Sequence, residues 1–270
     1  MEIGIGSYVY RWAIGCGDFA PRNPMTAFEL LEKAIELDVK IVQLCENISL
    51  QGYNSKSLRQ LRRRAEERGI ALEIGIQEAD LSILRAYLAT AIFLGCNLVR
   101  VALNTPGKHP TLNESVEIIN ELLPVLKTES ITLALENHFH LSSMEMLKLV
   151  KVVNNPLVGI CLDTVNSIGL LEKPLDTVRS LAPYAVSVHL KDYKIVQCSV
   201  GYRIVGTPLG AGFLDIESVI DLLNRSPYNP NIILEQWMDR LKSEEKTLQM
   251  EEDWVRRSVK HIKKSLGARS

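Results

Sequence analysis

The sequence predicts an α/β fold, a single (β/α)8 TIM barrel spanning residues 1–270. Short apolar runs rich in β-branched residues alternate from end to end with longer stretches of helical periodicity, which is typical of βα units around a parallel sheet. Eight such units in 270 residues fit a closed barrel better than an open doubly wound sheet. No linker rich in proline and serine and no low-complexity tract divides the chain, so we expect one domain.

The apolar runs predict eight strands, near residues 2–8, 39–45, 70–76, 97–103, 131–136, 158–163, 185–190 and 231–235. The periodic stretches predict eight helices, near residues 25–37, 55–68, 80–94, 112–128, 142–153, 174–182, 215–224 and 244–264. Start signals precede several of these helices, such as Ser55, Asp80 and Ser142. Gly69 follows a basic final turn, where a glycine suits the left-handed cap of a helix.

Composition argues against several classes of partner. The 31 basic and 32 acidic residues give a net charge of −1, so no overall field attracts nucleic acid or an anionic membrane. The start of the chain lacks a signal-peptide pattern, and no apolar run approaches the roughly 20 residues of a membrane span. The five cysteines form no CxxC motif and predict no disulfide framework. We therefore expect a cytoplasmic protein with a small-molecule substrate, and a homo-oligomer is compatible with the sequence.

Four metal-ligand side chains end the last four predicted strands: Glu136, Asp163, His189 and Glu235. Any one of them alone would be interpreted as a helix cap or a solvated loop residue. In a TIM barrel, however, the C-terminal ends of the strands converge on one mouth, where the chemistry takes place. Carboxylate oxygens and an imidazole nitrogen suit Mn²⁺, Mg²⁺, Co²⁺ or Zn²⁺. The set therefore predicts one divalent-metal site.

Three local segments resemble the xylose-isomerase-like TIM-barrel superfamily, which includes sugar phosphate isomerases and epimerases related to tagatose epimerase. The segments are LENH at 135–138, HLKD at 189–192 and PLGAGFLD at 208–215, and the likeness extends over nearly the whole chain. The resemblance implies that Glu136, Asp163, His189 and Glu235 are the metal ligands. It also implies a metal-dependent isomerase or epimerase of a sugar or sugar phosphate, in which Glu136 and Glu235 exchange a substrate proton through a metal-stabilised enediolate.

Two departures from that family pattern leave other activities open. Asn166 stands three residues after Asp163, where epimerase relatives often carry a histidine, and an amide cannot act as an acid or base near neutral pH. Arg203 stands 14 residues after His189, further on than the usual arginine. The alternative is a metal-dependent lyase on the same site, either a 3-oxo sugar-acid decarboxylase or a keto-acid dehydratase. A non-catalytic sugar-binding protein is a third interpretation.

Five residues are predicted to contact the substrate, which would be a carbohydrate or a sugar acid. Arg203 could clamp a carboxylate or phosphate, or form a salt bridge within a loop. Lys191 should point the same way as His189, where it would meet an oxyanion or pair with an acid. Asn166 could bind a hydroxyl, His138 is expected to touch substrate rather than the metal, and Trp237 could wall the pocket or only pack.

A DNA-repair endonuclease of the same superfamily is disfavoured. Such enzymes need a multinuclear zinc cluster with more histidines than this chain supplies, and the sequence has no basic stripe.

Overall fold

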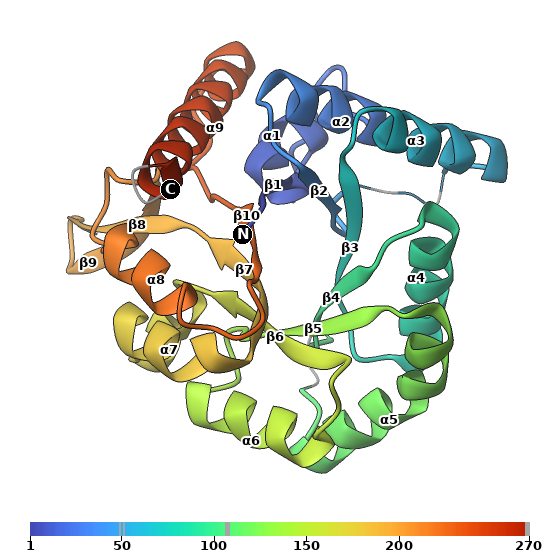
Figure 1. Cartoon of the computed structure of the whole chain (residues 1–270). Coiled ribbons are helices and arrows are strands. Elements are labelled where there is room, and N and C mark those ends of the chain that lie inside the picture. The colour runs from blue at the N-terminus through green and yellow to red at the C-terminus, as the bar shows by residue number, and fades with distance from the viewer. Residues whose placement is uncertain (49, 51, 106–108, 268–270) are drawn as a thin grey trace.

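A computed structural model describes residues 1–48, 50, 52–105 and 109–267. Eight parallel strands close into a barrel in the order β1-β10-β7-β6-β5-β4-β3-β2 (Figure 1). Every predicted strand is present, within two residues of its expected bounds. The TIM-barrel prediction is therefore confirmed. The strands are β1 (Ile3–Gly6), β2 (Ile41–Leu44), β3 (Ala71–Gln77), β4 (Leu98–Ala102), β5 (Thr132–Glu136), β6 (Val158–Asp163), β7 (Ala185–Leu190) and β10 (Asn231–Leu234).

Helices surround the barrel (Figure 1), and all eight that the sequence predicts are present within three residues of their expected bounds. They are α2 (Ala27–Glu36), α3 (Ser55–Glu67), α4 (Leu81–Leu94), α5 (Leu112–Glu129), α6 (Ser143–Val153), α7 (Pro174–Leu181), α8 (Ile216–Leu223) and α9 (Glu244–Gly267). A short 3-10 turn (Ser7–Tyr10) and α1 (Arg11–Ile14) follow β1. None of the helices described is both long and apolar enough to cross a membrane.

The helix start signals are mostly where the sequence predicts them. Asp80 accepts hydrogen bonds from the backbone N–H groups of Ser82 and Ile83, and Ser142 forms a capping box with Glu145. Ser55 is the exception, because the cap of α3 is Asn54, whose side chain accepts from Ser57 N. The asparagine competes for the same backbone donors one residue earlier, so Ser55 becomes the first helical residue.

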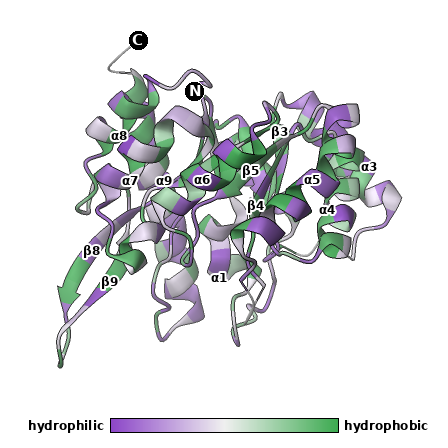
Figure 2. Ribbon diagram, turned by 90° about the horizontal axis from the view of Figure 1, so that it is seen from below, coloured by the Kyte–Doolittle hydropathy of each residue, from purple (hydrophilic) through white to green (hydrophobic). Residues whose placement is uncertain are grey.

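An antiparallel hairpin, β8 (Asp192–Gln197) and β9 (Tyr202–Thr207), was not predicted from the sequence. Its two strands pair from Asp192 opposite Thr207 to Gln197 opposite Tyr202, and Figure 2 shows them extending beyond the helices. The base of the hairpin lies against the chain at Trp237. A Cβ atom on Gly206 would come within 2.4 Å of the Trp237 carbonyl oxygen, so this approach requires glycine.

Candidate functional site

The ends of β5, β6 and β7 bring three potential metal ligands together. One ligand atom from each of Glu136, Asp163 and His189 lies within 4.8 Å of the others, and all three residues are buried. Glu235 follows β10, and its Oε1 lies 3.2 Å from His189 Nδ1, while Glu136 Oε1 lies 3.6 Å from the same nitrogen. Adjacent ligand atoms around an octahedral ion with bonds of about 2.1 Å are roughly 3 Å apart. Glu136, Asp163 and His189 are therefore close enough to share one ion, and Glu235 lies beside His189.

The hydrogen bonds of His189 suit a metal ligand. Its Nε2 lies 2.9 Å from Gln43 Oε1, an atom that only accepts, so Nε2 carries the hydrogen. Its Nδ1 is buried, faces the two glutamates and has no hydrogen-bond partner among the described residues. A buried nitrogen that faces carboxylates and lacks a hydrogen-bond partner is suited to bind a metal ion. The cluster could therefore bind a divalent metal.

Burial and neighbouring charges shift the pKa values of these groups in different directions. Burial by itself would raise the pKa of Glu136, but Arg100 and His189 outweigh it and hold that pKa well below its usual range. Burial raises the pKa of Asp163 despite the attraction of Lys191. For His189, burial favours the neutral ring, yet Cys161, Glu235 and Glu136 raise its pKa well above the usual value. A proton and a metal ion would therefore compete for His189 Nδ1.

Backbone and amide groups hold two of the carboxylates in place. Asp163 Oδ1 accepts from the N–H groups of Val165 and Asn166, at 2.8 and 2.7 Å. The Asn166 side chain donates to Glu136 Oε1 at 3.0 Å. Asn137 joins the ends of β5 and β6, because its side chain accepts from Asp163 N at 2.7 Å and donates to Asp163 O at 2.9 Å. The LENH segment thus supplies a candidate ligand, Glu136, and the neighbouring Asn137, which holds the end of β6 in place.

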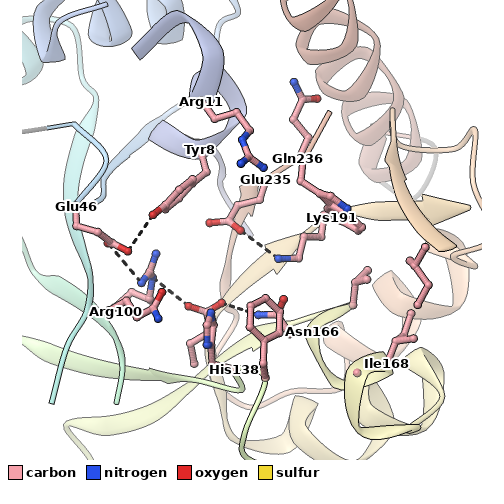
Figure 3. Close-up of a pocket in the computed structure, with 17 residues that line it drawn as sticks. Tyr8, Arg11, Glu46, Arg100, His138, Asn166, Ile168, Lys191, Glu235 and Gln236 are labelled. Atoms are coloured by element: carbon pink, nitrogen blue, oxygen red, sulfur yellow. Dashed lines mark hydrogen bonds and ion pairs between the residues drawn. The ribbon is translucent and has the colours of Figure 1, made fainter. Parts of the chain in front are cut away.

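A cavity of about 430 Å³ opens above the candidate ligands (Figure 3). Glu136 and Glu235 face it, together with four of the five predicted substrate contacts: His138, Asn166, Lys191 and Trp237. Burial lowers the pKa of His138, which favours a neutral imidazole at the cavity wall. The Lys191 ammonium lies 5.6 Å from the Trp237 ring centroid, a cation–π distance. The cavity has the size of a pocket for a small polar molecule.

Arg203 lies outside this cavity, so the structure offers no support for the expectation that it clamps the substrate. It does not line the cavity, its side chain is 57% exposed, and its Nη2 lies 2.7 Å from Asp239 Oδ2. The reason is the alternation of side chains along β9: Ile204 faces the cavity, so its neighbour Arg203 faces the other way. The ion pair of Arg203 in β9 with Asp239, which follows β10, agrees with the alternative of a salt bridge.

Arg11 and Arg100 line the cavity instead, and sequence reasoning missed both. Arg100 is buried in β4, where its Nε lies 3.3 Å from Glu136 Oε2. A charged residue inside the apolar run LVRVA was the available signal, because buried charges need a partner. Arg11 directly follows the 3-10 turn after β1, and nothing in its local sequence marks it.

The surroundings of Arg11 differ from those of the other cations in the cavity. Arg100 pairs with Glu136, and Lys191 lies 2.6 Å from Asp163 Oδ2. No carboxylate of the described residues lies within ion-pair distance of the Arg11 guanidinium, which stacks on Trp12 at 4.9 Å and donates to Cys16 Sγ at 2.9 Å. Its buried Nε has no hydrogen-bond partner among those residues. In Figure 3 the guanidinium points toward the pocket on the side of Glu235.

Asp192 explains why the HLKD and PLGAGFLD segments occur together. Its buried carboxylate accepts backbone N–H groups from Tyr193 and from three residues of the second segment, Gly210, Gly212 and Leu214, at 2.8 to 3.0 Å. A Cβ atom on Gly212 would come within 2.1 Å of Asp192 Oδ1, so the loop can wrap the carboxylate only with glycine there. Asp192 therefore fixes the loop beside the hairpin.

Comparison with known proteins agrees with this fold. The family model described as xylose isomerase-like TIM barrel matches residues 31–265. The chain is 29% identical over 264 residues to a 3-oxo-isoapionate decarboxylase from Pectobacterium atrosepticum, covering 97% of this chain and 95% of that protein.

Two solved structures share the fold. A D-psicose 3-epimerase from Clostridium cellulolyticum H10, crystallised with D-tagatose, has a TM-score of 0.74 and 16% identity, with 98% of each chain covered. A xylose isomerase-like TIM barrel protein from Mycobacterium smegmatis in complex with magnesium has a TM-score of 0.67 and 17% identity, with 96% of this chain and 97% of that chain covered. At these identities the likeness concerns the fold.

Proposed function

This chain belongs to the xylose isomerase-like TIM barrel family, and on that premise we propose that it is a divalent-metal-dependent decarboxylase of a 3-oxo sugar acid. The observation that carries the proposal is the Arg11 guanidinium, which faces the same cavity as Glu136 and Glu235 and has no carboxylate of the described residues within ion-pair distance. A cation in that position favours an anionic substrate. The similarity to a 3-oxo-isoapionate decarboxylase over 97% of the chain supports the same substrate class.

We assign Glu136, Asp163, His189 and Glu235 as the ligands of the ion, which would be Mn²⁺, Mg²⁺, Co²⁺ or Zn²⁺. When bound, such an ion supplies a Lewis acid that stabilises negative charge on a substrate ketone oxygen. The low pKa of Glu136, with Arg100 and Asn166 holding its carboxylate, keeps this residue ionised as a ligand. It is therefore poorly suited to donate a proton.

The reaction breaks one carbon–carbon bond. The bond between the carboxylate carbon and C2 of the 3-oxo acid breaks, carbon dioxide leaves, and the electron pair moves toward the C3 ketone oxygen. C2 then takes up a proton. Lys191 and Glu235 are placed to supply it, because both face the cavity and Lys191 Nζ lies 3.4 Å from Glu235 Oε2. Asp163 and Glu235 raise the pKa of Lys191 despite its burial, so the pair holds a proton at neutral pH.

Arg11 would orient the leaving carboxylate rather than promote its departure. Decarboxylation converts a charged carboxylate into neutral carbon dioxide, so a guanidinium contact stabilises the bound substrate more than the transition state. The contribution of Arg11 is then to binding and orientation, and its loss should appear mainly in KM.

The second candidate is the isomerase or epimerase that the sequence predicted first. It is favoured by Glu136 and Glu235, which both face the cavity and have an oxygen 3.6 and 3.2 Å, respectively, from His189 Nδ1. In that reaction one glutamate removes a carbon-bound proton and the other returns it.

Product analysis separates these candidates. Protein loaded with Mn²⁺ would be incubated with 3-oxo-isoapionate and, separately, with neutral keto sugars in deuterated water. We expect carbon dioxide from the acid, with deuterium in the product at the carbon that was C2 of the acid, and no activity in Asp163→Asn or after treatment with a chelator. Deuterium exchange in the neutral sugars without carbon dioxide from the acid would instead identify an epimerase.

A further inference from the structure

A network of hydrogen-bonded polar side chains crosses the barrel interior beneath the candidate ligands. Glu73 on β3 and Gln43 on β2 are fully buried, and Asn231 at the start of β10 is partly buried. Gln43 Nε2 donates to Glu73 Oε2 and Asn231 Nδ2 donates to Glu73 Oε1, each at 3.0 Å. The other end of the Gln43 amide lies 2.9 Å from His189 Nε2. Burying a carboxylate without a cation is costly, and the proposed reaction does not use Glu73.

The direction of each hydrogen bond in this network follows from Glu73. Burial raises the pKa of Glu73, and each oxygen of its carboxyl group accepts one amide N–H, from Gln43 and from Asn231. The Gln43 NH₂ group must therefore face Glu73, which turns the amide oxygen toward His189. That oxygen accepts from His189 Nε2, so the lone pair of the ring lies on Nδ1, toward Glu136 and Glu235.

The opposite orientation of Gln43 would prevent metal binding. Its oxygen would then face Glu73 Oε2, and the hydrogen bond from the Gln43 NH₂ group to that oxygen would be lost. Its NH₂ group would face His189 Nε2 and require a lone pair there, so the ring hydrogen would move to Nδ1. A protonated Nδ1 cannot bind a metal ion.

We propose that Glu73, through Gln43, fixes the tautomer and orientation of His189 so that Nδ1 is presented to the ion. Gln43 and Glu73 are thus positioning residues, and neither touches substrate. Outer partners of metal-binding histidines typically change metal affinity by about 10- to 100-fold when they are removed. The effect on affinity rests on the proposed metal-dependent function, whereas the tautomer of His189 can be measured without it.

The first test uses metal affinity. Gln43→Met keeps the length of the side chain and removes both polar groups, so Mn²⁺ affinity measured by calorimetry should fall about 10-fold or more. Ile41→Val is the matched control, because Ile41 stands two residues earlier on the same side of β2, and its affinity should stay within about twofold of wild type. Equal affinities for wild type and a folded Gln43→Met variant would overturn the proposal.

The second test determines the tautomer directly in the wild-type protein. Long-range ¹H–¹⁵N spectra of histidine-labelled wild type loaded with Zn²⁺ should show the hydrogen of His189 on Nε2, with the resonance assigned by its loss in His189→Gln. A hydrogen on Nδ1, with Nε2 bound to zinc, would overturn the proposal. Failure of wild type to bind any divalent ion would reject the proposed metal function, and the tautomer assignment would still stand if the neutral ring of the metal-free protein, at a pH above the pKa of His189, carried its hydrogen on Nε2.

Glu73→Gln distinguishes positioning from charge. The new amide can still accept from Gln43, because Asn231 at the strand end can turn its own oxygen toward it. We expect this variant to keep the Nε2 hydrogen and most of the Mn²⁺ affinity, whereas Glu73→Leu, which removes the acceptor, should weaken affinity in the same direction as Gln43→Met. Wild-type Mn²⁺ affinity in a folded Glu73→Leu variant would show that Glu73 does not fix the orientation of Gln43 and His189.

Discussion

Lys191 Nζ lies 2.6 Å from Asp163 Oδ2 and 3.4 Å from Glu235 Oε2, so an ammonium group is placed against two of the candidate metal ligands. All three side chains are nearly buried, which leaves these charges weakly screened by solvent. A divalent ion in the same cluster would share its carboxylates with this ammonium. Lys191 therefore influences both the binding of the ion and the charge that the cavity presents to a substrate.

Replacing Lys191 should strengthen metal binding while reducing turnover. In Lys191→Met the repulsion between the ammonium and the ion is removed, and we expect Mn²⁺ affinity to rise about tenfold, equivalent to about 1.4 kcal/mol. Calorimetric titration in the absence of substrate would measure this. Lys194→Met on the exposed face of the hairpin is the control and should leave the affinity unchanged. A weaker affinity in Lys191→Met would mean that the lysine supports the site rather than competing with the ion.

Arg11 and Arg203 form a matched pair of arginines for testing substrate charge. Arg11→Ala should lower kcat/KM for a 3-oxo sugar acid about 10- to 100-fold, mainly through KM, because one charged hydrogen bond typically contributes about 1.5–3 kcal/mol. Arg203→Ala removes only an exposed ion pair with Asp239 and should change kcat/KM by less than about twofold. Steady-state kinetics with metal analysis would check both variants. Similar losses in the two variants would contradict the assignment of Arg11.

The comparison of these arginines shows where sequence reasoning stops. The spacing from His189 led to Arg203, but on a strand one residue decides which face a side chain takes, and Ile204 takes the cavity face. The register of β9 depends on the hairpin, whose alternation of polar and apolar residues is too weak to predict. Arg11 reaches the cavity from the first strand, far from His189 in sequence, so only the closed barrel brings it near.

The strand ends could be predicted because each strand is marked by a local pattern in the sequence. Apolar runs mark the strands, and parallel strands in a barrel place their C-terminal ends together, which explains how Glu136, Asp163 and His189 meet. The supporting residues Gln43 and Glu73 lie within apolar strands, where a polar residue is only an anomaly until its partner is known. Their partnership crosses the barrel and is not encoded in any sequence spacing.

Asp192 should be more important for stability than an exposed acid of the same loop. Asp192→Asn replaces one carboxylate oxygen by an NH₂ group, which leaves two backbone N–H groups without an acceptor, and we expect a loss of about 3 kcal/mol in the free energy of unfolding. Asp215→Asn is the control, because Asp215 is an exposed helix cap and asparagine caps equally well. Urea unfolding of both variants would show the difference. Comparable losses would indicate that the loop does not depend on the Asp192 carboxylate.

Protonation of Glu251 should make the free energy of unfolding depend on pH. This residue of α9 is buried and accepts the N–H groups of Trp12 and Ala13 at 2.8 and 3.0 Å, which ties the helix to the segment that carries Arg11. Burial raises the pKa of Glu251 to about 7, and the two backbone hydrogen bonds offset only part of that shift. Between the ordinary value of about 4.3 and this pKa, the folded protein binds more protons at this site than the unfolded chain does. The contribution of Glu251 to the free energy of unfolding therefore falls as pH rises through that window and is constant above it.

Removing the ionisable group should remove this pH dependence. From about pH 5 to about pH 7.5, wild type should lose stability relative to Glu251→Gln by on the order of 2 kcal/mol, because the glutamine side chain does not have to be ionised in a buried position. Urea unfolding at the two pH values would measure the difference. Glu245→Gln, an exposed change on the same helix, should follow the wild-type profile. If the free energies of unfolding of wild type and Glu251→Gln changed in parallel over this range, Glu251 would not be the group whose protonation makes stability depend on pH.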